Sequence, residues 1–476
     1  MRTLIAPPAG RALSIAAPAN ISFNSSAAFT RHARPNPPPQ PSRAKTAASV
    51  AAVVLFMTSA SEQAAAQFIC QQYGGSFGGA SAGTQAVACG SNANAGGTGA
   101  MAFGNQAQSL GAYSAALGFL ARSATDNASA IGGYSRAEGN NATAIGSAAA
   151  ATGADSTAIG SAAEAQGTDT AAIGAGAQAI ATNTSAIGAD ALAQGINSTS
   201  IGNSSQARGD NSTAIGRASR SLGQSSTASG ALARASADFS TAIGTDSQAT
   251  GLGSTAAGAS AIASGDNASA YGKSATATKS LTTAFGQSAA ASGDVATAAG
   301  SESIASAGKS SAFGNAAKAS GVGATALGQA AEASNTNATA VGLGAKATSV
   351  NSVAIGANAL ASGSTAVGTN SQATGIRSAA YGESALATGD TSTAIGEFSQ
   401  ATGTSSVALG TSSTASGDAS TSIGVLSQAT HKNAAAFGNS AATTRDDQQV
   451  FGTNTNTYTM TGIASTASKA AQAAGR

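Results

Sequence analysis

Few residues in this chain carry side chains suited to catalysis or to binding a metal ion. Its 476 residues include two histidines, His32 and His431, and two cysteines, Cys70 and Cys89. A catalytic relay needs a histidine beside a nucleophile and an acid, and a histidine metal site needs several ligands together. His32 lies in the N-terminal opening of the chain, so His431 stands alone in the remainder, at a position where other segments carry a glycine. We therefore expect no enzyme, no metal site and no cofactor, and we interpret His431 as a turn residue.

The two cysteines lie close together near the expected start of an exported chain. Because disulfides form and persist in exported proteins, the sequence predicts a disulfide between Cys70 and Cys89, within one chain or between chains. Cys89 also occupies a position that is apolar in other repeats, so a buried thiol is the alternative. A disulfide there would hold the first repeat, where a repeat protein needs a cap.

Residues 1–66 have the order of segments found in a secretory signal. A basic, proline-rich opening precedes the apolar run Ala47–Met57 and then Ala64-Ala65-Ala66, which predicts cleavage between Ala66 and Gln67. The apolar run is too short to span a bilayer as a stable helix. The opening is unusually long, so either the signal is of an extended type or translation starts downstream of Met1.

The composition beyond this signal argues against nucleic-acid binding and against an ordinary globular core. Residues 1–61 hold six of the 22 basic residues and no acid, which leaves 16 bases against 20 acids in the rest. Nucleic-acid binding needs a basic stripe, and here the bases are scattered, one or two per repeat at most. All eight prolines precede Ser42. A long chain without proline suits a continuous β-ladder.

A glycine that recurs with a 14-residue period defines the organisation of the chain. The period runs from Gly90 to Gly356 and, after one shorter step to Gly368, continues to Gly452, which gives 27 repeats. An apolar residue precedes each of these glycines except at Ser229, and alanine stands one place earlier in 24 repeats. A second glycine often follows halfway to the next one, with Asp or Asn after it, which indicates a turn. The pattern predicts an all-β fold, a parallel solenoid of 14-residue coils with two short strands and two turns each.

Alternation along the first strand gives it one face with Thr and Ile and another with Ala. We expect the Ile face to fill a thin interior. The uniformly small Ala column would then form a flat outer surface for side-by-side packing with other chains. Each coil encloses little volume and depends on its neighbours. The expected structural core column is Ile131, Ile145, Ile159, Ile173, Ile187, Ile201, Ile215, Ile243, Ile355, Ile395 and Ile423.

The repeat between Gly356 and Gly368 lacks two residues. Comparison of Gly363–Gly368 with Gly389–Gly396 places the loss in a turn, because the residues of the strand are all present. We expect the stack of coils to continue there through a tightened turn.

Segments such as Asn211-Ser212-Thr213-Ala214-Ile215-Gly216 resemble the head repeats of YadA-like trimeric autotransporter adhesins, over residues 86–453. The resemblance implies a left-handed parallel β-roll, a side-by-side homotrimer, and display at the outer membrane of a Gram-negative bacterium, where the head attaches to host or matrix macromolecules. It divides the chain into the signal at 1–66, an N-terminal cap at 67–85, the head repeats at 86–453 and a tail at 454–476 that starts a neck or stalk. The tail has neither sustained heptads nor barrel strands. We therefore expect the membrane anchor to be missing from this chain, either because the chain is truncated, which we favour, or because it is secreted.

Three functions are open to such a rod. Outward positions are mostly Ser, Thr, Ala, Asn and Gln, with few charges and no aromatic cluster, so adhesion would rest on many weak contacts rather than on a hot spot. A structural spacer that presents another domain is the main alternative, and it predicts no binding by the rod. An ice-binding solenoid is a further alternative, although its threonine column is expected inside with the isoleucines. That column is Thr143, Thr157, Thr199, Thr213, Thr241 and Thr255.

Overall fold

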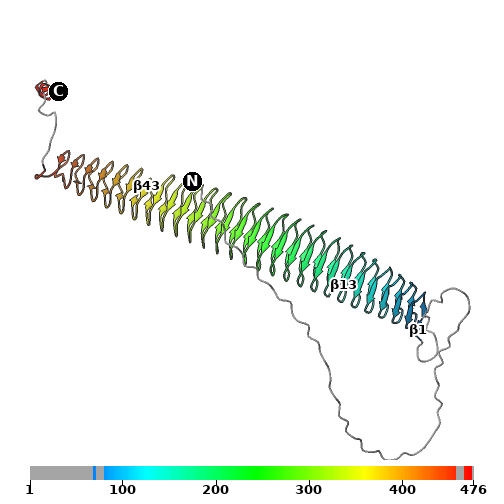
Figure 1. The fold of residues 1–476 in the computed structure, drawn as a ribbon. Helices are drawn as coiled ribbons and strands as arrows, with labels where there is room; N and C mark the ends of the chain where they lie inside the picture. Colours follow the sequence, from blue (N-terminus) through cyan, green and yellow to red (C-terminus); the bar gives the residue numbers. More distant parts are fainter. Residues whose placement is uncertain (1–67, 71–79, 457–465, 474–476) are drawn as a thin grey trace, which may run out of the picture. The chain divides into compact units, whose positions relative to one another are not determined.

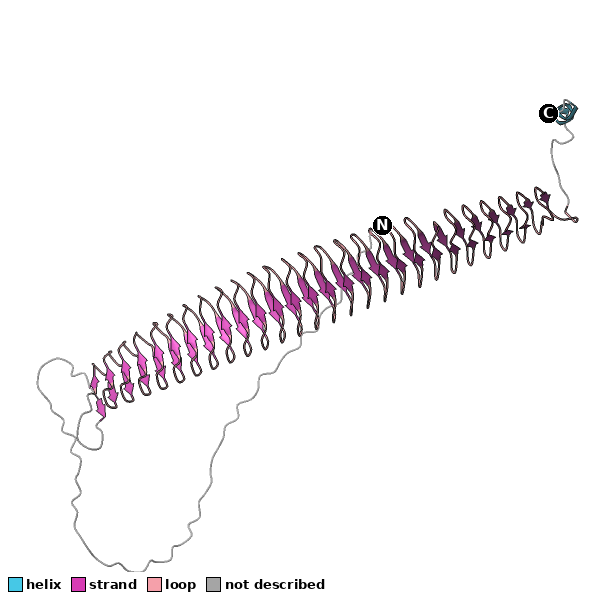
Figure 2. Ribbon diagram, turned by 180° about the vertical axis from the view of Figure 1, so that it is seen from behind, coloured by secondary structure: helices cyan, strands magenta, loops and turns pink. Residues whose placement is uncertain are grey.

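Each 14-residue repeat forms one coil, which contributes a strand to each of two parallel sheets. The structure is a computed structural model and describes residues 68–70, 80–456 and 466–473. In one coil, β11 (Thr143–Ile145) belongs to the first sheet and β12 (Ala150–Ala151) to the second. Equivalent strands form two ladders along the stack of coils (Figures 1 and 2). The first sheet has 28 strands, and the second runs from β2 (Ser81–Ala82) to β52 (Gln428–Ala429). The expected parallel solenoid of 14-residue coils is confirmed.

Neighbouring coils keep the same register because equivalent residues pair. Strand β11 lies beside β13 (Thr157–Ile159), with Thr143 opposite Thr157 and Ile145 opposite Ile159. The amide of Thr143 donates a hydrogen bond to the carbonyl of Ser156 in the next coil at 2.8 Å. Each strand is only two or three residues long, so its stability comes from the ladder rather than from its own length.

Two turns close each coil, which we call the first corner, after the first sheet, and the second corner, after the second sheet. In the first corner at Gly342–Ala345, Gly342 has φ +131°, a region that only glycine adopts readily. A Cβ atom on Gly342 would also lie 2.5 Å from the carbonyl oxygen of Gly356 in the next coil. Gly344 has φ +63°, and in the next coil Asn358 takes this left-handed position at φ +55°. The 14-residue glycine period therefore marks the place where the backbones of successive coils touch.

Four columns of small residues line the interior of the solenoid. Thr184 and Thr282 are the largest fully buried side chains in the described part of the chain. Where serine replaces alanine inside, its hydroxyl usually bonds to the backbone, as when Ser156 Oγ donates to the carbonyl of Gly153 at 2.6 Å. The inward residues of one coil, none with any exposed surface, are Ala142, Ala144, Ala149 and Ala151.

The predicted core column of isoleucines is wrong, because these side chains lie on the outside. Nine of the eleven have 36–48% of their surface exposed, and the other two are half-buried. The alanine column that we expected to face outward is the interior. The two sheets of a 14-residue coil approach so closely that only methyl and hydroxyl groups fit between them, since protein interiors are close-packed. The outward residues are Ile131, Ile145, Ile159, Ile173, Ile187, Ile201, Ile215, Ile243, Ile355, Ile395 and Ile423.

The coil that lacks two residues stays in the stack. Strand β41 (Val353–Ile355) pairs with β43 (Thr365–Val367), so that Ile355 lies opposite Val367 in the usual register. In the second sheet, β42 (Leu360–Ala361) pairs with β44 (Gln372–Ala373). The missing residues belong to the second corner, where the amide of Gly363 still donates to the carbonyl of Ala373 at 2.9 Å. The expected continuation through a tightened turn is confirmed.

The first sheet extends beyond the second at both ends. Strand β1 (Phe68–Cys70) pairs with β3 (Val87–Cys89) at one end, and β53 (Ala435–Phe437) with β54 (Gln449–Phe451) at the other. In β54, Val450 stands where other coils have an inward alanine, and it is half-buried. A larger side chain at this position fits the last strand of the first sheet among the described residues. The helix α1 (Thr466–Ala473) is a separate element. A search of the described residues for a helix with the length and apolar character of a membrane span found none.

Candidate binding surfaces

The outer face of the first sheet carries one exposed or half-buried apolar residue in almost every coil. We call this column the apolar stripe, and it consists of the residue before each first-corner glycine, from Phe103 to Phe451. Among its exposed members, the exposed fraction ranges from 36% at Ile201 to 61% at Phe285. Ser229 is the polar exception. Soluble monomers rarely expose an apolar surface of this extent, and such surfaces usually mark a place where another molecule binds. The apolar stripe is therefore a candidate interface.

The threonine column lies beside the apolar stripe and is also outside, where it is half-buried. We expected it inside with the isoleucines, so this expectation is wrong as well. The neighbouring stripe varies in size from Ala257 to Tyr271. A surface with such variation is poorly suited to the regular match that ice requires, and nothing in the structure favours an ice-binding function.

The second corner carries ladders of polar side chains that join one coil to the next. Asn183 Nδ2 donates to Asn197 Oδ1 at 3.0 Å, and Asn197 Nδ2 to Asn211 Oδ1 at 3.1 Å. The carboxylate of Asp210 accepts the backbone amide of Ile196 in the preceding coil at 2.8 Å. The Asp and Asn residues that follow the second glycine therefore connect the corners of successive coils. Their side-chain polar atoms find hydrogen-bond partners within the stack.

Two aromatic side chains come together near the N-terminal end of the stack. The rings of Phe119 and Tyr134 meet edge to face with centroids 5.3 Å apart, and the two residues are 46% and 56% exposed. Arg122 lies nearby in sequence on β8 (Arg122–Ser123) and forms an ion pair with Glu138 at 3.5 Å. Our expectation that the surface has no aromatic cluster is therefore wrong at this point.

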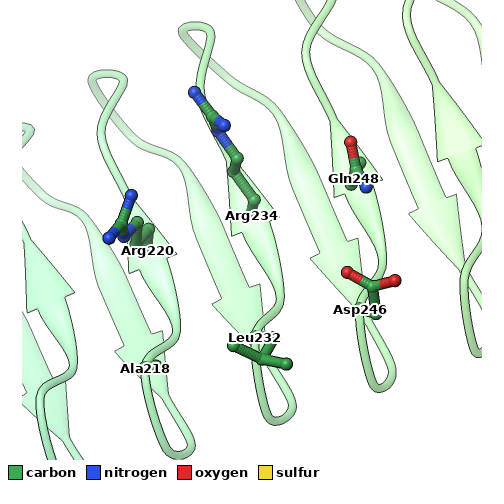
Figure 3. A pocket seen from close by; sticks show the side chains of 6 residues that line it. All are labelled: Ala218, Arg220, Leu232, Arg234, Asp246 and Gln248. Atoms are coloured by element: carbon green, nitrogen blue, oxygen red, sulfur yellow. The ribbon is translucent and has the colours of Figure 1, made fainter.

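The outer face of the second sheet is mostly polar, with Leu or Ile in some coils. Residues of this face and of the first corners line a hollow of about 300 Å³. Its lining comes from three successive coils, and Figure 3 shows the side chains of Arg220, Arg234 and Gln248 above Leu232 and Asp246. Arg220 lies in β22 (Arg220–Ser221) and pairs directly with Arg234 in β24 (Arg234–Ala235). This pairing could have been predicted from the sequence, because the two arginines are one repeat apart.

The predicted disulfide residues are neighbours in the first sheet. Cys70 lies opposite Cys89 in the pairing of β1 with β3, and Cys89 is disulfide-bonded. Since the chain has no third cysteine, we keep the pairing of Cys70 with Cys89 as a proposal. It would clip the first strand of the stack to the first full coil.

The other candidate residues lie outside the described part of the chain or in the second corner. The predicted cleavage position between Ala66 and Gln67 lies outside the described residues. His431 lies in the second corner, where its Nδ1 atom is 3.1 Å from the hydroxyl oxygens of both Thr430 and Thr443. In the part of the chain that the structure describes, no three His, Cys, Asp or Glu side chains gather as metal ligands.

The sequence of this parallel solenoid matches one family model over many of its coils. The matching family is the YadA head domain repeat (2 copies), at residues 81–107, 95–121, 126–149, 137–163, 165–191, 193–219, 221–247, 249–275, 305–331, 333–359, 360–385, 387–413 and 415–441. These matches cover more than half of the chain, so the chain belongs to this family of adhesin heads. The predicted resemblance is confirmed.

Two further comparisons complete this result. No curated protein matches the sequence. Among solved structures, the chain is similar to the crystal structure of the collagen-binding domain of the Yersinia adhesin YadA. The sequence identity is 17%, the match covers 58% of this chain and 76% of that chain, and the TM-score is 0.11.

Proposed function

We propose that this chain is the head of a surface adhesin that works as a homotrimer, with the apolar stripes of three copies facing one another. The observation that supports this proposal is the stripe itself, which runs along the outer face of the first sheet with no covering element among the described residues. Three copies would close their stripes around one axis and leave their second sheets outward. The Ala column, which we first assigned to this contact, lies inside each coil and takes no part in it.

The energetic reason for assembly recurs in most coils, wherever the stripe residue is a large apolar one. Burying roughly 50 Å² of apolar surface per coil contributes about 1 kcal/mol at 25 cal/mol per Å². A single contact of this size is weak, but the stripe repeats it along the whole stack. An isolated chain would expose this apolar surface to water, which is unfavourable. The monomer should therefore have a higher free energy than the trimer.

The adhesive role follows from the family and from the repetition of the surface. The chain presents equivalent polar positions coil after coil, and three chains multiply them, so weak contacts to a macromolecular surface would act together through effective concentration. Host or matrix macromolecules are the ligands we propose. No enzymatic function is proposed, because the family is one of adhesins.

We also propose that residues 1–66 direct export and that the head is displayed on the surface of a Gram-negative bacterium. N-terminal sequencing of the protein recovered from the cell surface should give Gln67 as the first residue. A mature chain that retains the apolar run Ala47–Met57 would contradict the proposed signal.

Sedimentation of the purified chain tests the assembly. The expected result is a trimer at micromolar concentration, and a folded monomer would contradict the proposal. The adhesive role is tested separately, by a binding screen of the trimer against collagen, other matrix proteins and cell surfaces. If the folded trimer binds none of them, the rod is a structural spacer rather than an adhesin.

A further inference from the structure

Four of the eight arginines in the described part of the chain occur between residues 208 and 234. Arg220 and Arg234 lie on the outer face of the second sheet, because their neighbours Ser221 and Ala235 are buried. Arg208 follows strand β20 (Gln206–Ala207) with the same alternation and is exposed on this face. Arg217 is exposed in the adjoining first corner. We call these four residues the arginine patch.

Like charges placed opposite each other on paired strands destabilise a sheet. Arg220 and Arg234 are such a pair, separated by the inter-strand distance of about 4.8 Å. In the flanking coils the same column carries Gln206 and Gln248. Glutamine at positions 220 and 234 would therefore allow these coils to fold without the repulsion between two arginines. The pair therefore has no evident role in stabilising the stack.

The other neighbouring basic residues in this column have an acidic residue beside them, which sets the arginine patch apart. Arg122 and Arg136 are paired in β8 and β10 (Arg136–Ala137), and Arg122 forms an ion pair with Glu138. Lys318 and Lys346 occupy alternate coils, and Glu332 lies between them in the same column. Within the described residues, the ion pair of Arg122 is the sole salt bridge, so neither Arg220 nor Arg234 has a carboxylate partner.

The guanidinium groups of the pair are arranged to meet a ligand. Arg234 Nε donates to Ser236 Oγ at 2.9 Å, which orients the group and leaves its terminal nitrogens free to donate. Both guanidinium groups lie away from Asp246, which is the one carboxylate at the hollow (Figure 3). Leu232, 46% exposed, supplies an apolar surface beneath them. Arginine binds sulfate, phosphate and carboxylate groups bidentately, whereas lysine offers only a point charge.

We infer that the arginine patch is a binding site for a sulfated polysaccharide, whose chain crosses the coils and places sulfate groups against Arg220 and Arg234. Two observations favour a glycan over a nucleic acid. The residues that line the hollow include no aromatic side chain, on which bases could stack. The chain beyond residue 61 is also mildly acidic, with 16 bases against 20 acids, so a long polyanion would be repelled elsewhere while a short sulfated segment fits three coils. The choice of an extracellular glycan rests on the proposed surface function, whereas the anion site itself does not.

The test measures binding of a fluorescently labelled heparin oligosaccharide to the purified full chain in solution. The double variant R220Q/R234Q introduces the residue that this column already carries in both flanking coils, so it should fold normally. We expect it to bind heparin at least tenfold more weakly, and its logarithmic salt dependence should be shallower by about 1.5 to 2. The control K318Q/K346Q removes the same charge from the same column and should bind within twofold of the unsubstituted chain.

Desulfated heparin should not compete with the labelled oligosaccharide. Equal binding by R220Q/R234Q and the unsubstituted chain would overturn the site, as would an equal loss in K318Q/K346Q. Tighter binding of polyphosphate or of single-stranded DNA than of heparin would overturn the assignment to a sulfated glycan. Because the assay uses no matrix protein or cell surface, its result is independent of the adhesion screen.

Discussion

Ala158 and Ile159 are consecutive residues of β13, yet Ala158 has no exposed surface and Ile159 is 37% exposed. In the other coils from β3 to β53 the inner residue is likewise buried, and the outer residue is exposed or half-buried. The inner residue sets how closely the two sheets of a chain approach. In the proposed homotrimer, the outer residue is the one that becomes buried between chains.

Substitutions at these two positions should therefore have opposite kinds of effect. Ala158→Leu places three further carbons in an interior that elsewhere holds nothing larger than threonine, and overpacking of this kind costs about 1–3 kcal/mol or more. We expect faster amide exchange in residues 144–172, with distant coils unchanged. Ile159→Ser should fold, since Ser229 occupies the same slot. Similar exchange in both variants would contradict the assignment of the faces.

The apolar stripe should govern assembly. The triple variant I173S/I187S/I201S removes three successive members and should weaken the trimer by about 1 kcal/mol per coil and chain, which sedimentation at decreasing concentration would detect. The matched control L192S/L360S/L386S changes three leucines that lie half-buried on the outer face of the second sheet. That control should leave the trimer intact. If both variants dissociate alike, the stripe is not the interface.

Reduction of the disulfide should loosen only the N-terminal end of the stack. Closing a loop of the length between Cys70 and Cys89 stabilises by about 3 kcal/mol, and each coil contacts only its neighbours. Hydrogen exchange with and without reductant should differ in residues 81–103 and not beyond Gly146. The single variant C70S should behave like the reduced chain. Dimers that appear on non-reducing electrophoresis would show that the bond joins two chains instead.

Two glycines of one corner should respond differently to substitution. Gly342→Ala adds a Cβ that meets the backbone of Gly356 at 2.5 Å and should lower the denaturation midpoint. Gly344→Asn places an asparagine where left-handed Asn residues are common, next to Asn358, whose Nδ2 already donates to Asn370 Oδ1 at 3.3 Å. The added Cβ would lie 2.7 Å from Asn358 Oδ1, a side-chain atom that can move aside, and asparagine tolerates the left-handed region. This change should therefore lower the denaturation midpoint much less than Gly342→Ala. Equal destabilisation by the two variants would contradict the backbone contact at Gly342 as the difference between these positions.

Adhesion should depend on the number of coils more than on any one residue. Deletion of residues 245–356 removes whole coils and joins Gly244 to Ala357 without a change of register. We expect the adhesion of the trimer to fall at least tenfold, because effective concentration decreases with each lost contact. Tyr134→Ser, which breaks the exposed aromatic pair with Phe119, should reduce it less than twofold. Abolition of binding by Tyr134→Ser alone would instead identify a discrete hot spot.

The glycine period was enough to predict the coil, its parallel ladder and the position of the shortened turn. The face of the strand could not be decided in the same way, because alternation separates Ala158 from Ile159 without saying which one is inside. Volume decides it, and the volume inside a 14-residue coil depends on how the two corners fold. Arg220 and Arg234 could have been paired because they are one repeat apart, whereas Phe119 and Tyr134 occupy different positions of their repeats and meet only through the shape of the first corner.

Because each coil meets its neighbours through the same backbone register, the fold has no preferred number of coils. The pairing of Ile355 with Val367 across the shortened coil shows that even a loss of two residues is absorbed within one corner. Duplication or deletion of DNA that encodes whole repeats would therefore yield a rod of different length with every remaining contact preserved. The length of the rod, and with it the proposed reach from the cell surface, is thus a heritable quantity that recombination between repeats could adjust in steps of one coil while the sequence pattern of each coil stays the same.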